Sequence, residues 1–203
     1  NRHNRSSDTP CFQALFSQTA QRVPEQTAVI DGERAWSYAE LETESDLLSL
    51  YLQGRGAQPD QLIIIFMSAS YEYILSALSI LKAGSAFLPV PVDLPLAQVQ
   101  MIVDDADPAQ ILTTPRDERH LEGLSGGHPI LSFSADALDD VFNDVSREHS
   151  ANLSVTDQAL ERGLAPLVIT QPDHLAFATY TSGTTGKPKG VLQVQRALVT
   201  SYQ

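Results

Sequence analysis

Apolar residues recur at helical spacing near the start of the chain. Within residues 8–22, Phe12, Leu15 and Phe16 fall on one face, and Pro10 suits the first position of a helix. This spacing predicts an amphipathic helix over the segment.

A hairpin and a second helix are predicted next. Asp31 and Gly32 separate two short β-prone runs, which favours a tight turn between strands. Ser37 followed by Glu40 is the pattern of a capping box, so a helix is expected to begin after Ser37. The glycine at position 54 or the one at position 56 is expected to end it. Three leucines form the apolar face of this helix: Leu41, Leu48 and Leu52.

Residues 62–66, LIIIF, are continuously apolar rather than alternating. This pattern is typical of a strand buried on both faces of a parallel sheet. Further strands are predicted at 85–90 and 109–114, and a short helix is expected from Pro95. Between the first two strands, residues 71–82 form a predicted helix with one apolar side, made of Ile74, Leu75, Leu78 and Leu81. The alternation predicts an α/β fold with a mostly parallel sheet flanked by helices.

The pattern weakens after residue 115. Residues 134–145, SADALDDVFNDV, are compatible with a short acidic helix that presents a solvated face, and residues 146–172 are predicted to be rich in loops. Residues 174–182, HLAFATYTS, read as a strand that runs into a glycine-rich loop. A strand at 190–193 and the start of a helix are expected after that loop.

Positive charge is concentrated in this loop. The 203-residue chain has a formal net charge of −12 and three lysines, and two of these lysines, Lys187 and Lys189, lie in the loop sequence YTSGTTGKPKGV. The overall negative field would repel nucleic acid and anionic membranes, so no nucleic-acid or membrane partner is expected. A small anion is the expected partner of the loop.

The loop has the chemistry of a phosphate-binding loop. Its glycines let the backbone approach a ligand closely, its hydroxyls donate hydrogen bonds, and its lysines supply charge. The spacing excludes a Walker loop, because Lys187 precedes a proline and two residues separate the glycines. A flexible surface turn is the alternative interpretation. The candidate binding residues are Thr181, Ser182, Gly183, Thr184, Thr185, Gly186, Lys187, Lys189 and Gly190.

Three stretches together carry a family resemblance. YTSGTTGKPKG resembles the signature loop of adenylate-forming, or AMP-binding, enzymes: acyl-CoA ligases, luciferases and the adenylation domains of nonribosomal peptide synthetases. WSYAELE at 36–42 and LKAGSAFLPV at 81–90 are similar to the first two core motifs of synthetase adenylation domains. We interpret both as scaffold, with Lys82 favoured by the dipole at a helix C-terminus. The chain departs from the family pattern at Pro91, where an aspartate is usual, and at Gln195, where a histidine is frequent.

The resemblance implies a reaction in which a carboxylate attacks the α-phosphate of ATP to give an acyl-adenylate and pyrophosphate. The acyl group then passes to the phosphopantetheine thiol of a carrier domain. Lys189 and Thr185 are the expected catalytic residues, and Thr184 matches a further phosphate contact. Mg²⁺ is expected to act with them, held by a glutamate beyond the chain, so no metal ligand is assigned to these residues.

The remaining features place this reaction in a larger protein. Residues 1–10 are interpreted as a linker, and residues 11–203 as the N-terminal portion of an adenylation domain that is expected to be inactive in isolation. The single cysteine fits a reducing compartment, and a cytoplasmic location is expected. The identity of the acid is not encoded here.

Other interpretations remain open at this level. One is a non-catalytic remnant or interaction module with the same partial fold. Another is an acyl-CoA ligase or a synthetase-like carboxylic acid reductase, and an unrelated nucleotide hydrolase is disfavoured by the Walker spacing.

Overall fold

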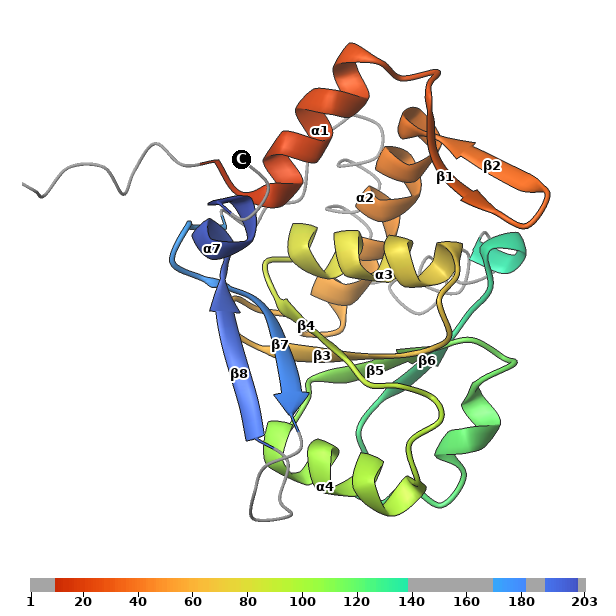
Figure 1. The fold of residues 1–203 in the computed structure, drawn as a ribbon, viewed down its shortest axis with the longest axis vertical. Helices are drawn as coiled ribbons and strands as arrows, with labels where there is room; N and C mark the ends of the chain where they lie inside the picture. The colour runs from red at the N-terminus through yellow and green to blue at the C-terminus, as the bar shows by residue number, and fades with distance from the viewer. Residues whose placement is uncertain (1–9, 139–169, 182–188, 201–203) are drawn as a thin grey trace, which may run out of the picture.

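A sheet with the strand order β6-β5-β3-β4-β7-β8 runs through the centre of the described chain (Figure 1). The structure is a computed structural model and describes residues 10–138, 170–181 and 189–200. The strands of this sheet are β3 (Leu62–Phe66), β4 (Ala86–Pro89), β5 (Gln110–Thr113), β6 (Ile130–Ser132), β7 (Leu175–Thr181) and β8 (Lys189–Val194).

The sheet is mainly parallel, as the sequence predicted. β3 pairs in parallel with β4 and β5, β5 pairs with β6, and β4 pairs with β7. Only β8 runs antiparallel to its neighbour β7. The predicted segments 62–66, 85–90 and 109–114 therefore lie in one parallel sheet, and the α/β prediction is confirmed.

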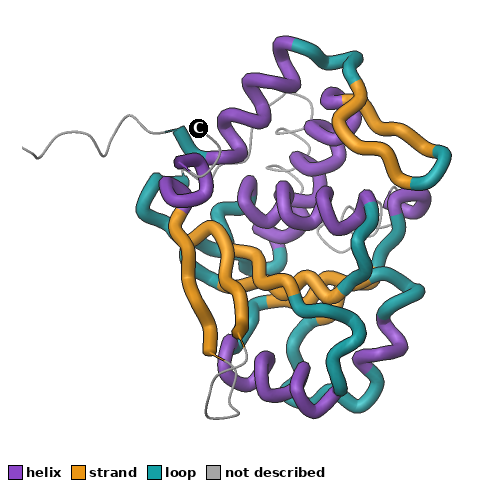
Figure 2. The backbone as a smooth tube through the Cα atoms, in the orientation of Figure 1, coloured by secondary structure: helices purple, strands orange, loops and turns teal. Residues whose placement is uncertain are grey.

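Helices cover both faces of this sheet (Figure 2). The helices are α1 (Phe12–Arg22), α2 (Tyr38–Gly54), α3 (Tyr71–Lys82), α4 (Leu96–Ala106) and α7 (Gln195–Thr200), and the 3₁₀ turns are η1 (Glu118–Leu121) and η2 (Ala135–Ala137). Helices α1, α2 and α3 lie on one side of the sheet, and α4 lies on the other. Ile63 and Ile65 of β3 pack into the core beneath α2 and α3, whereas Ile64 and Phe66 pack against α4. The alternation of side chains along one strand thus joins two cores.

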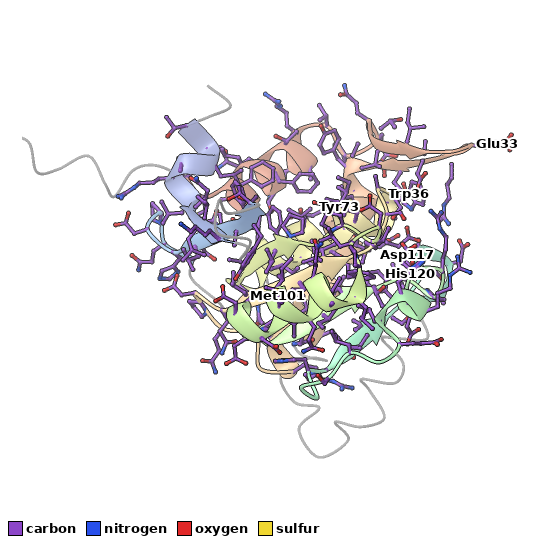
Figure 3. The ribbon with its side chains drawn as sticks, turned by 60° about the horizontal axis from the view of Figure 1, so that its bottom comes forward. Glu33, Trp36, Tyr73, Met101, Asp117 and His120 are labelled. Carbon is purple, nitrogen blue, oxygen red and sulfur yellow. The ribbon has the colours of Figure 1, made fainter. Side chains whose placement is uncertain are left out.

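The predicted hairpin and capping box are confirmed. β1 (Thr27–Asp31) and β2 (Arg34–Ser37) pair antiparallel, and Gly32 at the turn has φ +61°. Figure 3 shows Glu33 at the tip of this hairpin, away from the main body. The Ser37 hydroxyl accepts a hydrogen bond from the Glu40 N–H, and the Glu40 carboxylate accepts one from the Ser37 N–H. The two residues satisfy each other's backbone donors at the start of α2.

One local prediction was wrong. Helix α1 begins at Phe12 with Cys11 as its N-cap, so Pro10 precedes the helix instead of opening it; the Cys11 carbonyl already accepts from Ala14 and Leu15. Of the four residues predicted on one side of α3, Leu75, Leu78 and Leu81 are buried, whereas Ile74 is 42% exposed.

Ile74 is exposed because the covering of α3 is incomplete at that point. It lines an open apolar groove of about 360 Å³ together with residues of α1, β1 and α7, while Leu75 and Leu78 of the same helix are buried. Helical spacing fixes the face on which a residue lies, but a neighbouring helix must reach that face to bury it.

Of the predicted acidic helix at 134–145, the structure describes only residues 134–138, which include η2; residues 139–145 lie outside the described residues, as does most of 146–172.

Lys82 is held by more than a helix dipole. Its side chain is 3% exposed, and its ammonium nitrogen lies 2.8 Å from a Glu42 carboxylate oxygen and 2.6 Å from one of Asp46. It also donates to the Glu42 carbonyl at 3.2 Å. Burial raises the pKa of the Asp46 carboxyl from its ordinary value, although the nearby ammonium opposes that rise. The scaffold interpretation of the second motif is confirmed, because Lys82 joins α3 to α2.

Replacing Lys82 is expected to destabilise this scaffold. Lys82→Met would leave Glu42 and Asp46 facing each other without a cation, at a cost of about 2 kcal/mol at pH 7, below the usual range for buried pairs because both carboxylates reach water. Without the cation the pKa of Asp46 rises further, so its carboxyl binds a proton more tightly in the folded state than in the unfolded state. The loss should therefore shrink as the pH falls towards 4.

Urea unfolding at pH 7 and pH 4.5 measures this effect. Lys82→Met combined with Glu42→Gln and Asp46→Asn is the matched control, and it should recover most of the lost stability because no charge remains. A Lys82→Met chain as stable as the wild type at pH 7 would contradict the role given to this ion pair.

Candidate functional site

The two ends of the glycine-rich loop lie opposite each other in a hairpin. β7 ends at Thr181 and β8 begins at Lys189, and these two residues are register partners in the antiparallel pairing. Figure 2 shows the two strands side by side. Of the predicted binding residues, the structure therefore brings together Thr181, Lys189 and Gly190. The others lie outside the described residues: Ser182, Gly183, Thr184, Thr185, Gly186 and Lys187.

The predicted strand at 190–193 is confirmed and extends over Lys189–Val194. The loop is thus the connection of a hairpin, and no helix starts directly after it; α7 begins only at Gln195. A helix N-terminus supplies the positive field in many phosphate sites. Here the described groups that can supply it are the Lys189 ammonium and the hairpin's outward-facing backbone.

Thr181 and Lys189 are accessible to a ligand. Both residues and Gly190 are exposed, and within the described part of the chain Lys189 forms no ion pair. Paired residues of an antiparallel ribbon project from the same face, so the Thr181 hydroxyl and the Lys189 ammonium extend together. A hydroxyl donor beside a mobile cation is a suitable pair for phosphate oxygens.

Tyr180 and Gly190 form the next register pair of the hairpin. A Cβ atom built on Gly190 would lie only 3.2 Å from the Tyr180 ring carbon Cζ, so the ring covers this glycine. The Tyr180 hydroxyl donates a 2.7 Å hydrogen bond to Asp105 in α4. Burial, and secondarily Asp105, raise the pKa of Tyr180 above its ordinary value, which keeps the phenol protonated and able to donate. Sequence reasoning did not assign a role to either Tyr180 or Asp105.

Gln195 occupies the position where the resembling family often has a histidine. It is fully buried at the start of α7, and its side-chain oxygen accepts from the Phe12 N–H at 3.4 Å. The Cys11 N-cap makes no side-chain hydrogen bond to α1, so Gln195 supplies an acceptor there. The amide of this residue therefore joins the helix after the hairpin to the first helix of the chain.

A second polar cluster lies at the carboxyl ends of β3 and β5. The buried Asp117 carboxylate accepts from the Ser68 N–H at 2.8 Å and from the Thr114 hydroxyl at 3.3 Å. His120 lies beside it, with its Nδ1 3.2 Å from the Asp117 carbonyl oxygen (Figure 3). Arg116 approaches the same carboxylate at 3.6 Å. These donors satisfy the Asp117 charge, so the cluster ties together the loops that follow β3 and β5.

Among residues 10–138, 170–181 and 189–200, no group of three or more histidine, cysteine, aspartate or glutamate side chains could hold a metal ion. In that part of the chain no helix combines the length and the apolar character needed to cross a bilayer.

The resemblance of the loop to the AMP-binding signature is tested by comparison with protein families. A family model described as "AMP-binding enzyme" matches residues 16–203. The chain belongs to the AMP-binding enzyme family.

Similar members of this family are large synthetases. Tyrocidine synthase 3 of Brevibacillus parabrevis is 32% identical over 189 residues, which cover 93% of this chain and 3% of that protein. Bacitracin synthase 3 of Bacillus licheniformis is 31% identical over 91% of this chain and 2% of its own length. Polyketide synthase PksN of Bacillus subtilis (strain 168) is 30% identical over 191 residues, which cover 94% of this chain and 3% of that protein. The chain thus spans only a few hundredths of these relatives.

Solved AMP-binding structures share the fold. The nonribosomal peptide synthetase FmoA3, in its α-methyl-L-serine-AMP bound form, matches with a TM-score of 0.75 and 25% identity, covering 98% of this chain and 20% of FmoA3. VinN matches with a TM-score of 0.76 and 22% identity, covering 97% of this chain and 46% of VinN. This match supports the fold alone. The described residues therefore have the fold of the N-terminal part of adenylation domains.

Gly190→Ala is expected to weaken the hairpin. The added methyl group would press on the Tyr180 ring, whose hydroxyl is held by Asp105, so either the ring or the hydrogen bond must shift. The cost is expected to be about 1 kcal/mol, the lower limit of overpacking effects. Urea unfolding of Gly190→Ala measures it.

Tyr180→Ala provides the matched background for this measurement. With the ring absent, Gly190→Ala should cost less than it does in the wild type, because the three atoms nearest to the added methyl group all belong to Tyr180. Equal losses in the presence and absence of the ring would contradict the contact.

Proposed function

We propose that these residues form the N-terminal part of an enzyme that activates an amino acid or another carboxylic acid as its acyl-adenylate with ATP. The acyl group is then transferred to the phosphopantetheine thiol of a carrier domain. The observation that carries the proposal is the pairing of Thr181 with Lys189 at the base of the signature loop, in a chain of the AMP-binding family.

The described residues fit the phosphate groups of ATP. Lys189 is the exposed cation at the hairpin end, and Thr181 beside it offers a hydroxyl donor. Both act on the β- and γ-phosphates, where negative charge increases as pyrophosphate leaves. Thr184 and Thr185, assigned by resemblance, are proposed to add two hydroxyl donors, and Thr185 to act with Lys189 in catalysis.

The proposed reaction has two steps, and each step forms one bond and breaks another. A carboxylate oxygen of the substrate attacks the α-phosphorus, and the bond from that phosphorus to the bridging oxygen of pyrophosphate breaks. In the second step the thiol sulfur attacks the acyl carbon, AMP leaves, and the thiol proton is lost. When bound to the phosphates, Mg²⁺ supplies further neutralisation of charge, and its protein ligands are proposed to lie outside the described residues.

The substrate class is supported by the relatives. Several are named as synthases of the peptides tyrocidine, gramicidin and bacitracin, and FmoA3 is described with an amino acyl-adenylate bound. We therefore propose an amino acid as the first substrate to test and a carrier domain as the thiol acceptor.

ATP–pyrophosphate exchange in the full-length protein tests this function. Exchange that depends on one acid from a panel of amino and aryl acids supports it. Acyl transfer to a carrier domain, compared with transfer to coenzyme A, identifies the thiol acceptor. A full-length protein that catalyses no exchange with any acid would support the alternative of a non-catalytic module.

Lys189→Ala is expected to lower the turnover of this exchange. Losing a charged contact to the leaving group should cost about 2–4 kcal/mol of transition-state stabilisation, by analogy with removal of an oxyanion donor, or roughly 30- to 1,000-fold in rate. The KM for the carboxylic acid should change little, because Lys189 contacts the phosphates.

Two variants control this measurement. Lys189→Arg keeps the charge and should retain more turnover than Lys189→Ala. Arg116→Ala removes an exposed cation beyond the carboxyl end of β5, which is separated from β7 by β3 and β4 in the strand order, and should leave the rate unchanged. Wild-type turnover by Lys189→Ala at saturating ATP would remove Lys189 from the mechanism.

A further inference from the structure

The end of the β7–β8 hairpin extends beyond the sheet that carries it. The only register pair joining β7 to β4 is Phe87 with Phe177. From Ala178 to Thr181, β7 is paired only with β8 among the described residues. An isolated two-stranded ribbon is marginally stable in water. Ala178 is buried in the core against α4, so the contact still needed to hold Thr181 and Lys189 in place lies beyond it.

Tyr180 makes that contact. Its ring lies over Gly190 of β8, and its hydroxyl reaches Asp105 of α4 at 2.7 Å. The side chain thus joins both strands of the hairpin to a helix 75 residues earlier in the sequence. Figure 1 shows the C-terminal end of α4 beside the end of β7.

Helix α4 is a firm support for this contact. Val99, Ile102 and Val103 are buried against Ile64 and Ile111 of the central strands. The helix is therefore fixed to the parallel sheet along its whole apolar face. A side chain tied to α4 is held relative to the sheet, and so are its neighbours in the hairpin.

The position of Asp105 in α4 is unfavourable for a carboxylate. It lies in the last turn of α4, where no basic residue is present and the carbonyl end of the dipole disfavours a carboxylate. A hydrogen bond to a phenol compensates this placement.

We propose that Tyr180 and Asp105 form a clamp that positions Thr181 and Lys189 for the phosphates of ATP. The proposal rests on the function proposed above. Tyr180 touches neither substrate in this scheme, and it acts through the next residue, Thr181, and through β8. Small displacements of positioned groups lower catalytic rates steeply. Loosening the clamp should therefore lower turnover more than stability.

The experiment uses the full-length protein, four single variants and the double variant that combines Tyr180→Phe with Asp105→Ala. Tyr180→Phe keeps the ring over Gly190 and removes only the hydroxyl. Asp105→Ala removes the acceptor, and Asp105→Asn retains one. Asp104→Ala is the matched control, because Asp104 is an exposed neighbour on the same helix that accepts its hydrogen bond from the side-chain amide of Gln100, also in α4.

Exchange kinetics give the first readout. Tyr180→Phe and Asp105→Ala should each lower kcat about 10-fold, equivalent to about 1.4 kcal/mol, with the KM for the acid unchanged. The double variant should be no slower than either single variant, because both remove the same bond. Asp105→Asn should retain most of the turnover, and Asp104→Ala all of it.

Amide hydrogen exchange gives a readout that needs no activity. Peptides that cover β7 and β8 should exchange faster in Tyr180→Phe and Asp105→Ala than in the wild type and the two other single variants. Melting temperatures should agree within about 4 °C, since the free energies involved are near 1 kcal/mol.

The outcomes separate the clamp from the function on which it rests. A wild-type protein without exchange activity overturns the proposed function, and hydrogen exchange then still decides whether the clamp exists. An active wild type with unchanged kcat in Tyr180→Phe overturns the positioning role. Equal protection of the hairpin in all variants overturns the clamp itself.

Discussion

Burial of β3 on both faces is the constraint on which the rest of the structure depends. Its isoleucines and Phe66 alternate between the core under α2 and α3 and the core over α4. A strand with no polar face can be satisfied only between two layers, so both sets of helices are required. Parallel neighbours follow, because each helical connection returns the chain to the same end of the sheet. Every later element, including the β7–β8 hairpin, takes its place from this strand.

The candidate site combines this rigid centre with a projecting end. β7 joins the sheet at Phe177 and then leaves it, so that Thr181 and Lys189 stand at an exposed edge. Such an edge is accessible to a highly charged ligand, and its phosphates would need paired, hydrogen-bonding groups wherever they leave water. The site also needs a defined geometry. Tyr180 offers one means of combining exposure with order, because its ring is partly buried while the residue after it is not.

The three lysines of the chain are likewise divided between the buried scaffold and the loop. Lys82 is buried in a structural ion pair between two helices, and the two other lysines of the chain belong to the loop. In a chain with a net charge of −12, Lys82 is buried, whereas the Lys189 ammonium is accessible at the end of the hairpin. A small polyanion repelled by the rest of the surface can therefore still be attracted there. This contrast agrees with a nucleotide phosphate as the ligand.

Much of this protein was determined by local sequence. Continuous and periodic apolar patterns predicted β3, α2 and α3, and the Ser37 and Glu40 pair predicted the start of α2, because these signals depend only on residues a few positions apart. The loop composition indicated phosphate chemistry for the same reason. Tertiary structure alone decided which faces found a partner: Ile74 remained partly exposed in the open groove that it lines with residues of α1, β1 and α7, and Gln195 became a cap for α1 across 183 residues. It likewise decided that the loop closes a hairpin with Thr181 opposite Lys189, and that Tyr180 reaches Asp105. Such contacts join segments that are far apart in the sequence and that the sheet brings together. A pattern of neighbouring residues does not contain the information on which distant segments will meet.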